Sequence, residues 1–229
     1  MADTTAESDT TAEVGTTAES DTTATRPRRR RNSLTEYEIL DAAEVVAADG
    51  YAALTMRAVA DALGAAPMSL YRYFATKDDL VDALLDRVLG RIEFDPETGD
   101  ARADLDAFAH RHLALLLAHP WAVAPLIAHP LPGPNAFPIG ERALAILERA
   151  GTTGDEAVAV FSGILALNYG WASFALSRSA PDAASSLARL FAATAPGLPR
   201  TAAVAAEMQH YGSDDHYDRV IARLLGAIG

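Results

Sequence analysis

Residues 50–64 read GYAALTMRAVADALG, and this stretch decides the fold. Thr55 is a residue type that accepts hydrogen bonds from free backbone amides, so it marks the start of a helix. Apolar side chains then recur at steps of three and four residues, which is the period of one helix face. Gly64 follows the last of them and ends the helix. The apolar positions are Met56, Val59, Ala60 and Leu63.

A second short helix is expected after a turn of about three residues. Pro67 lacks an amide hydrogen, so it fits the first turn of a helix, where that hydrogen would have no partner. Leu70, Tyr73 and Phe74 then fall on one side and are expected to be buried. Two short helices joined by a turn that contains glycine are typical of a helix-turn-helix, whose second helix enters the major groove of DNA.

Capping patterns predict one helix on each side of this pair. Thr35 with Glu38 forms a capping box that starts a first helix. Thr76 with Asp79 starts a fourth. An ordinary bundle of short helices with unrelated surface residues would give the same pattern, so the exposed side chains have to decide between the two interpretations.

The solvent face of the third helix has the side chains that DNA requires. It presents Met68, Ser69 and Arg72, with Tyr71 at its border, and no acidic residue. Such groups contact base edges, thymine methyls and phosphate oxygens without repelling the backbone. Lys77, the only lysine, lies in the first helical turn, where the helix dipole disfavours a cation. It is therefore a candidate phosphate contact, with a simple surface cation as the alternative.

The net charge of −12 is unevenly distributed along the chain. Residues 1–25 hold six acidic residues, no base and almost no large apolar side chain, so we expect them to be disordered. Residues 26–31 contain five arginines, which form a basic arm able to reach a phosphate backbone or a minor groove. A solvated charge run, a solubility tail or a misassigned start codon remain open as alternatives. The acidic tail could also compete with DNA for the arginines.

The rest of the chain is expected to be helical, which makes the protein all-α. Its apolar residues do not alternate with polar ones as they would in strands. Segments rich in proline and glycine separate the expected helices. The longest apolar run contains polar and glycine residues, and the N-terminus lacks an apolar signal core, so a soluble cytoplasmic protein without a membrane segment is expected. The expected helices span 100–119, 121–129, 137–150, 155–179, 182–194, 201–211 and 214–228.

Enzymatic signatures are missing from the sequence. It contains no cysteine, which excludes disulfides, thiolate zinc sites and cysteine nucleophiles. His110 and His112 are two residues apart, so they point to different faces of a helix and are poor metal co-ligands. Phosphate-binding loops, nucleophile elbows and zinc-protease motifs are absent. We therefore expect neither an enzyme nor a metal or cofactor. A DNA-binding protein without any small-molecule ligand remains an alternative.

Taken together, the stretch from Gly50 to Gly64 and the later Ser69-Leu70-Tyr71-Arg72-Tyr73-Phe74-x-x-Lys77-x-x-Leu80 resemble the TetR family of bacterial transcriptional regulators. The resemblance covers residues 32–92. It implies a homodimeric repressor whose N-terminal three-helix domains bind palindromic double-stranded operator DNA. A C-terminal helical domain, residues 93–229, would dimerise and bind a small-molecule inducer, and residues 1–31 would precede both domains as tail and arm.

The resemblance also assigns roles to residues of the helix-turn-helix. Thr55 and Lys77 look like phosphate contacts, and Tyr71 looks like the recognition-helix tyrosine of that family. Arg72 is included among the candidate DNA contacts because it lies on the solvent face of the third helix. The positions that resemble variable contacts to bases or nearby phosphates are Arg57, Pro67, Met68, Ser69 and Tyr73.

The order of the middle helices is similar to that of tetracycline-repressor-type members, but the polar groups that hold the drug and its magnesium ion are not expected here. The candidates describe a mostly apolar cavity with two imidazoles, which predicts a predominantly apolar inducer bound without metal. Each of them could equally be a core residue. The candidates are Phe108, His112, Leu126, His129, Phe137, Leu144, Phe161 and Leu165.

The resemblance further implies that the long helix 155–179 and the last helix pair with their copies in a four-helix interface. The last helix has an apolar stripe of the kind that such packing needs. The alternative is that the stripe packs inside its own subunit. The stripe consists of Tyr217, Val220, Ile221, Leu224 and Leu225.

Overall fold

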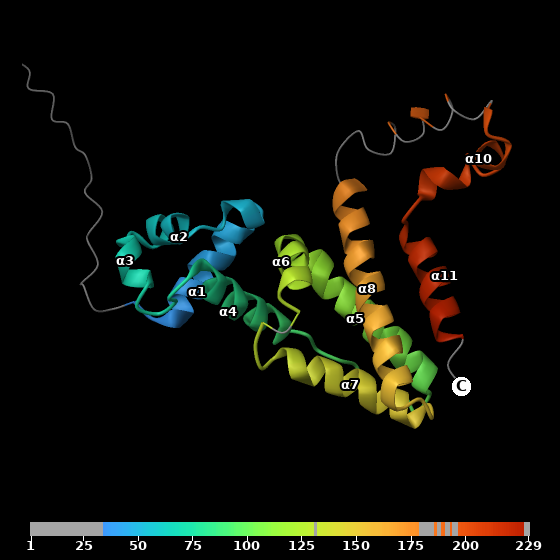
Figure 1. Ribbon diagram of the computed structural model, residues 1–229, viewed down its shortest axis with the longest axis horizontal. Coiled ribbons are helices and arrows are strands. Elements are labelled where there is room, and N and C mark those ends of the chain that lie inside the picture. Colours follow the sequence, from blue (N-terminus) through green and yellow to red (C-terminus); the bar gives the residue numbers. More distant parts are fainter. Residues whose placement is uncertain are drawn as a thin grey trace, which may run out of the picture.

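The computed structural model describes residues 34–130, 132–178 and 197–226, together with Ser186, Arg189, Leu190 and Ala193. All the regular elements in these residues are helices, which confirms the predicted all-α class (Figure 1). The predicted acidic tail and arginine arm, residues 1–31, lie outside the described residues. So does most of the expected helix 182–194.

The N-terminal helices begin and end close to where their caps predict. Thr35 with Glu38, and Thr76 with Asp79, form complete capping boxes, and Gly64 ends its helix in the left-handed region with φ of 63°. The elements are α1 (Glu36–Ala47), η1 (Tyr51–Ala53), α2 (Met56–Leu63), α3 (Pro67–Leu70) and α4 (Lys77–Leu89).

The third helix is shorter than its sequence suggests. α3 ends at Leu70, and residues 71–73 form a turn in which the Tyr73 amide donates to the Leu70 carbonyl at 2.9 Å. Such a bond to the third residue back tightens the chain at the end of a helix. Phe74 is buried as expected, whereas Tyr73 is 40% exposed. The recognition element is therefore one helical turn followed by a tight turn.

The C-terminal helices are arranged around α5. This helix packs against α7, α8 and α11, and it ends in the short corner formed by η2 and α6 (Figure 1). The elements are α5 (Ala101–Ala118), η2 (Pro120–Ala122), α6 (Val123–Ala128), α7 (Ala136–Arg149), α8 (Gly154–Arg178), α10 (Pro199–Ala203), η4 (Glu207–His210) and α11 (Asp214–Leu225).

The expected continuous helix 201–211 is wrong. The structure has two short pieces there, α10 and η4, separated by a turn at residues 204–206. None of the residues of α10 is buried. A short helix gains most of its stability from packing of its apolar face, so an unburied segment has little to extend it.

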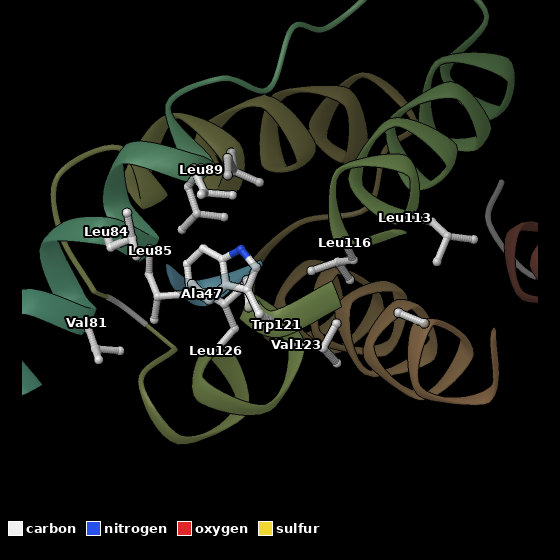
Figure 2. Packing of buried hydrophobic residues seen from close by; sticks show 14 of the residues in the cluster. Ala47, Val81, Leu84, Leu85, Leu89, Leu113, Leu116, Trp121, Val123 and Leu126 are labelled. Atoms are coloured by element: carbon white, nitrogen blue, oxygen red, sulfur yellow. The ribbon is translucent and has the colours of Figure 1, made fainter. Parts of the chain in front are cut away.

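α4 belongs to both halves of the molecule. Arg87 of α4 forms an ion pair with Asp41 of α1, and Arg91, just beyond the end of α4, pairs with Glu44 of α1. These ion pairs fix α4 to the N-terminal helices. Figure 2 shows the buried Trp121 of η2 close to the leucines of α4 and to Ala47 of α1. One continuous hydrophobic core thus joins the two sets of helices through α4.

The segment between α4 and α5 is held by arginines from the C-terminal helices. Arg142 donates to Glu97 at 2.6 Å, and Arg149 donates to Asp104 at 2.6 Å. The amide and hydroxyl of Thr98 also donate to Asp104. These hydrogen bonds stabilise the ionised carboxylate and hold the pKa of Asp104 at about 2. The charged network fixes the position of α5 relative to α7.

Candidate DNA-reading surface and ligand cavity

The nine predicted DNA-binding residues lie in three places along the chain. They occupy α2 with the cap that precedes it, α3 with the turn that follows it, and the first turn of α4. We call them the reading surface. α2 packs against α3, at the end of the molecule away from α8 and α11 (Figure 1). Met68 is 73% exposed, and Pro67, Tyr71 and Arg72 are also exposed. The reading surface consists of Thr55, Arg57, Pro67, Met68, Ser69, Tyr71, Arg72, Tyr73 and Lys77.

Several of these side chains also have a role within the domain. The Thr55 hydroxyl accepts from the Ala58 amide at 3.1 Å and so caps α2. The Tyr73 hydroxyl donates to the carbonyl of Leu34, just before α1. The Lys77 ammonium lies 4.6 Å from the centre of the Tyr51 ring. Lys77 is therefore held in a cation–π contact, and this contact with an uncharged ring does not neutralise its positive charge.

A cavity of about 660 Å³ lies among α5, α7 and α8, next to the segment that joins α6 to α7. Its wall is mainly apolar and aromatic, as in many small-molecule sites. Five of the eight predicted ligand-binding residues line it: His112, Phe137, Leu144, Phe161 and Leu165.

Other residues of the cavity wall were not predicted from the sequence. Tyr169 follows Leu165 by four positions on α8, so helical periodicity alone could have added it. Pro130 and Pro134 come from the α6–α7 segment, for which no periodic signal exists. Glu141 of α7 is exposed and lines the cavity as well.

The other three predicted ligand-binding residues do not line this cavity. Phe108 is buried behind it and stacks on Phe94, with ring centres 5.3 Å apart. Leu126 belongs to the core beside Trp121 (Figure 2). His129 turns towards α4, where its Nδ1 lies 2.8 Å from Oδ1 of Asp82.

His112 is the buried polar residue of the cavity wall. Its side chain is 1% exposed, and its Nδ1 lies 3.0 Å from Nδ2 of Asn168. Asn168 is fully buried and accepts a hydrogen bond from the Tyr217 hydroxyl at 2.7 Å. Burial lowers the pKa of His112 to about 4, so the imidazole is neutral at neutral pH.

The segment beside the cavity is bonded directly to α4. The backbone amide of Asn135 donates to Oδ1 of Asp86 at 2.7 Å, and its side-chain amide donates to Oδ2 at 2.9 Å. Gly133 lies so close that an added Cβ would be 2.4 Å from Cγ of Asp86. Since α4 also holds α1, this contact connects the cavity wall to the N-terminal helices.

The expected use of the α11 stripe is largely wrong. Tyr217, Ile221 and Leu225 are at most 1% exposed within one subunit, where α11 packs on α5. They cannot contact a second copy without being removed from this core. Val220 is 37% exposed, and Leu224 is partly buried.

Two family models match the chain. Residues 39–84 match the one described as "Bacterial regulatory proteins, tetR family". Residues 94–228 match the one described as "Tetracyclin repressor-like, C-terminal domain". The first match covers the helix-turn-helix, and the second covers the helices around the cavity.

Curated relatives are named as regulators of transcription. An HTH-type transcriptional regulator of Saccharopolyspora erythraea is 42% identical over 125 residues, which are 54% of this chain and 53% of that protein. The HTH-type transcriptional repressor DrrR1 of Streptomyces coeruleorubidus is 39% identical over 137 residues, 58% of this chain and 51% of DrrR1. The chain thus spans about half the length of these relatives.

A solved structure covers more of the chain. ActR of Streptomyces coelicolor, in complex with actinorhodin, matches with a TM-score of 0.75 and 25% sequence identity. The match covers 85% of this chain and 96% of ActR. The likeness therefore extends over both the N-terminal and the C-terminal helices.

Proposed function

Because the chain belongs to the tetR family of bacterial regulatory proteins, we propose that it is a homodimeric repressor that a small, mainly apolar molecule releases from operator DNA. The observation that supports this most directly is the bond between Asp86 of α4 and Asn135 beside the cavity. It gives a change in the cavity wall a short physical route to the helices of the reading surface.

The proposed DNA contact rests on the reading surface. α3 and the turn that follows it, residues 67–73, contain no acidic residue and expose small, aromatic and cationic side chains, a combination suited to base edges and phosphates. Two relatives that match much of the helical chain are named as a transcriptional regulator and a transcriptional repressor. Repression of transcription through double-stranded operator DNA is the function that fits both.

The proposed ligand is supported by the cavity. Its volume of about 660 Å³ and its aromatic wall suit a molecule of several fused or linked rings. ActR, which has a similar fold, was solved with actinorhodin bound. Release of DNA follows only if the ligand favours a conformation whose two reading surfaces no longer match adjacent major grooves.

The proposed dimer uses the outer face of α8. This helix is long and apolar enough for a membrane span by composition, yet only 28% of its apolar part is buried in the subunit. Beside exposed large residues such as Val158 and Phe174, it has a row of small outward positions, and a Cβ added to Gly163 or Gly170 would meet nothing within 4 Å. A second copy of α8 could therefore approach closely there. The α8 outer face consists of Ala159, Gly163, Ala166 and Gly170.

Lys77→Gln is expected to weaken binding to all DNA sequences alike. If Lys77 neutralises one phosphate, its loss should reduce the slope of log affinity against log salt by about one contact. Ser69→Ala, by contrast, should change the preferred sequence and leave the salt slope unchanged. Fluorescence anisotropy at several salt concentrations measures the slope, and selection from random DNA measures the preference.

A thermal melt serves as control for Lys77→Gln, because Lys77 also contacts the Tyr51 ring. An unchanged salt slope in a variant of unchanged stability would show that Lys77 is only a surface cation. An unchanged preferred sequence in Ser69→Ala would contradict its place on the reading surface.

Filling the cavity is expected to abolish induction but to leave operator affinity nearly intact. Leu144→Trp with Leu165→Trp adds two indole rings from the walls formed by α7 and α8. The added rings should exclude the ligand, so a cell-extract fraction that releases operator from the unaltered protein should no longer act. Anisotropy of labelled operator DNA with and without the fraction measures this.

Ala145→Trp is the matched control, since Ala145 lies on α7 next to Leu144 but is exposed and outside the cavity wall. It should behave like the unaltered protein. Release of the double variant by the same fraction would place the ligand elsewhere. If no fraction releases the unaltered protein, it acts as a DNA-binding protein without a small-molecule inducer.

A further inference from the structure

The polar groups of the cavity wall are few, so the chemistry of its ligand depends on them. Among the described residues that line the cavity, the ionisable side chains are those of His112, Glu141 and Tyr169. Glu141 is exposed, and the Tyr169 ring meets the His112 ring edge-on with centres 5.7 Å apart. For His112, the surrounding hydrogen bonds determine which ring nitrogen has the hydrogen atom.

The side-chain amide of Asn168 has only one acceptable orientation. Its Nδ2 lies 2.9 Å from the carbonyl oxygen of Ala109, while its Oδ1 accepts from the Tyr217 hydroxyl. Rotating the amide by half a turn would place two oxygen acceptors against each other at the Ala109 carbonyl. The group that faces both Ala109 and His112 is therefore the NH2.

This orientation determines the tautomer of His112. One hydrogen of the Asn168 NH2 bonds the Ala109 carbonyl, and the other points at Nδ1 of His112, 3.0 Å away. Nδ1 has to be the acceptor, so the hydrogen of the neutral ring lies on Nε2. Burial lowers the pKa of His112 and keeps the ring in this neutral form. Within the described part of the chain, Nε2 has no hydrogen-bond partner, and the ring forms part of the cavity wall.

We propose that His112 presents a fixed Nε2–H donor to the cavity, and that the ligand is an uncharged aromatic molecule with a carbonyl oxygen placed against it. The inference rests on the proposed ligand function of the cavity. A cationic group cannot accept a hydrogen bond from this donor, and the carboxylate of the described wall, Glu141, is exposed to solvent, where an ion pair contributes little. An anionic one would find no lysine or arginine in the described wall and would meet Glu141, so burying its charge would be costly.

The tautomer can be tested in the unliganded protein. In protein labelled with ¹⁵N-histidine, the long-range ¹H–¹⁵N spectrum at neutral pH should show His112 with a bare Nδ1 and a protonated Nε2. Comparison with the spectrum of His112→Phe assigns its signals. A protonated Nδ1, or a doubly protonated ring at neutral pH, would overturn the proposal without any assumption about the ligand.

The preference for a carbonyl is tested with two probes of nearly equal shape, 9-fluorenone and fluorene, which differ by a carbonyl in place of a methylene. Calorimetry should show that the unaltered protein binds the ketone about tenfold more tightly, as expected for one buried hydrogen bond. In His112→Phe this preference should disappear. Phe137→Leu, which changes only the apolar wall, should lower the affinity for both probes and keep the ratio of the two affinities.

Equal affinities of the unaltered protein for the two probes, or no binding of the ketone, would refute the carbonyl preference. Operator release is measured separately, so the two proposals can fail independently. A ketone that binds with the expected preference, when no cell-extract fraction releases operator from the unaltered protein, would contradict induction and not the role of His112. An inducing fraction that releases operator equally well from His112→Phe would contradict the role of His112 and not induction.

Discussion

Replacing Ala166 with arginine is expected to yield a monomer that binds operator DNA about a hundredfold more weakly. Two linked reading surfaces gain this order of affinity from binding two half-sites at once. Ala166 is exposed in the middle of the α8 outer face, between Gly163 and Gly170. An arginine there has room in the isolated subunit, and its helix propensity is close to that of alanine. It should obstruct only the approach of a second α8.

Sedimentation equilibrium measures the mass of the variant, and anisotropy compares DNA with one and with two half-sites. The affinity for a single half-site should stay nearly the same. Ala145→Arg, at an exposed position of α7, controls for the added charge and should remain dimeric. A dimer of unchanged stability in Ala166→Arg would refute the α8 outer face as the contact between copies.

Asp86→Ala is expected to separate ligand binding from DNA release. The variant removes the carboxylate that accepts both amides of Asn135, and of these bonds to α4 only that from the Asn135 side chain to the backbone carbonyl of residue 86, at 3.2 Å, can remain. Ligand and operator should still bind, but each should lose its effect on the affinity of the other. Coupling between such sites commonly amounts to a factor between about 5 and 150, so most of that factor should disappear.

The measurement is a linkage cycle, in which operator affinity is determined with and without the inducing fraction, and binding of the fraction with and without operator. Because linkage is reciprocal, both effects have to fall together. Glu148→Ala removes an exposed carboxylate from α7 and should leave the coupling unchanged. Full coupling in Asp86→Ala would show that the signal reaches α4 by another contact, such as that of His129 with Asp82.

Local chemistry made the N-terminal helices predictable. Thr35, Thr55 and Thr76 each cap the helix that follows them, because a cap depends on residues no more than three positions away. The end of α3 was less predictable. Its turn is accompanied by a hydrogen bond from Tyr73 to Leu34, a residue 39 positions away that no local pattern reveals.

Contacts between distant helices limited the prediction of the sites. The periodicity of α7 and α8 identified wall residues such as Leu144 and Leu165, but it could not tell that His129 would turn towards Asp82. The α11 stripe shows the same limit. An amphipathic helix has the same sequence pattern whether its apolar face packs on α5 of its own subunit or on a second copy.

The position of α4 within one continuous core also has a consequence for how the protein unfolds. The residues of α1 and those of η2 and α6 pack into the same hydrophobic cluster that α4 supports. If α4 separates from the helices of one half, apolar surface that it covers in the other half is exposed as well. Unfolding should therefore be cooperative across both sets of helices, and a molecule that binds in the cavity should also slow hydrogen exchange in the helix-turn-helix.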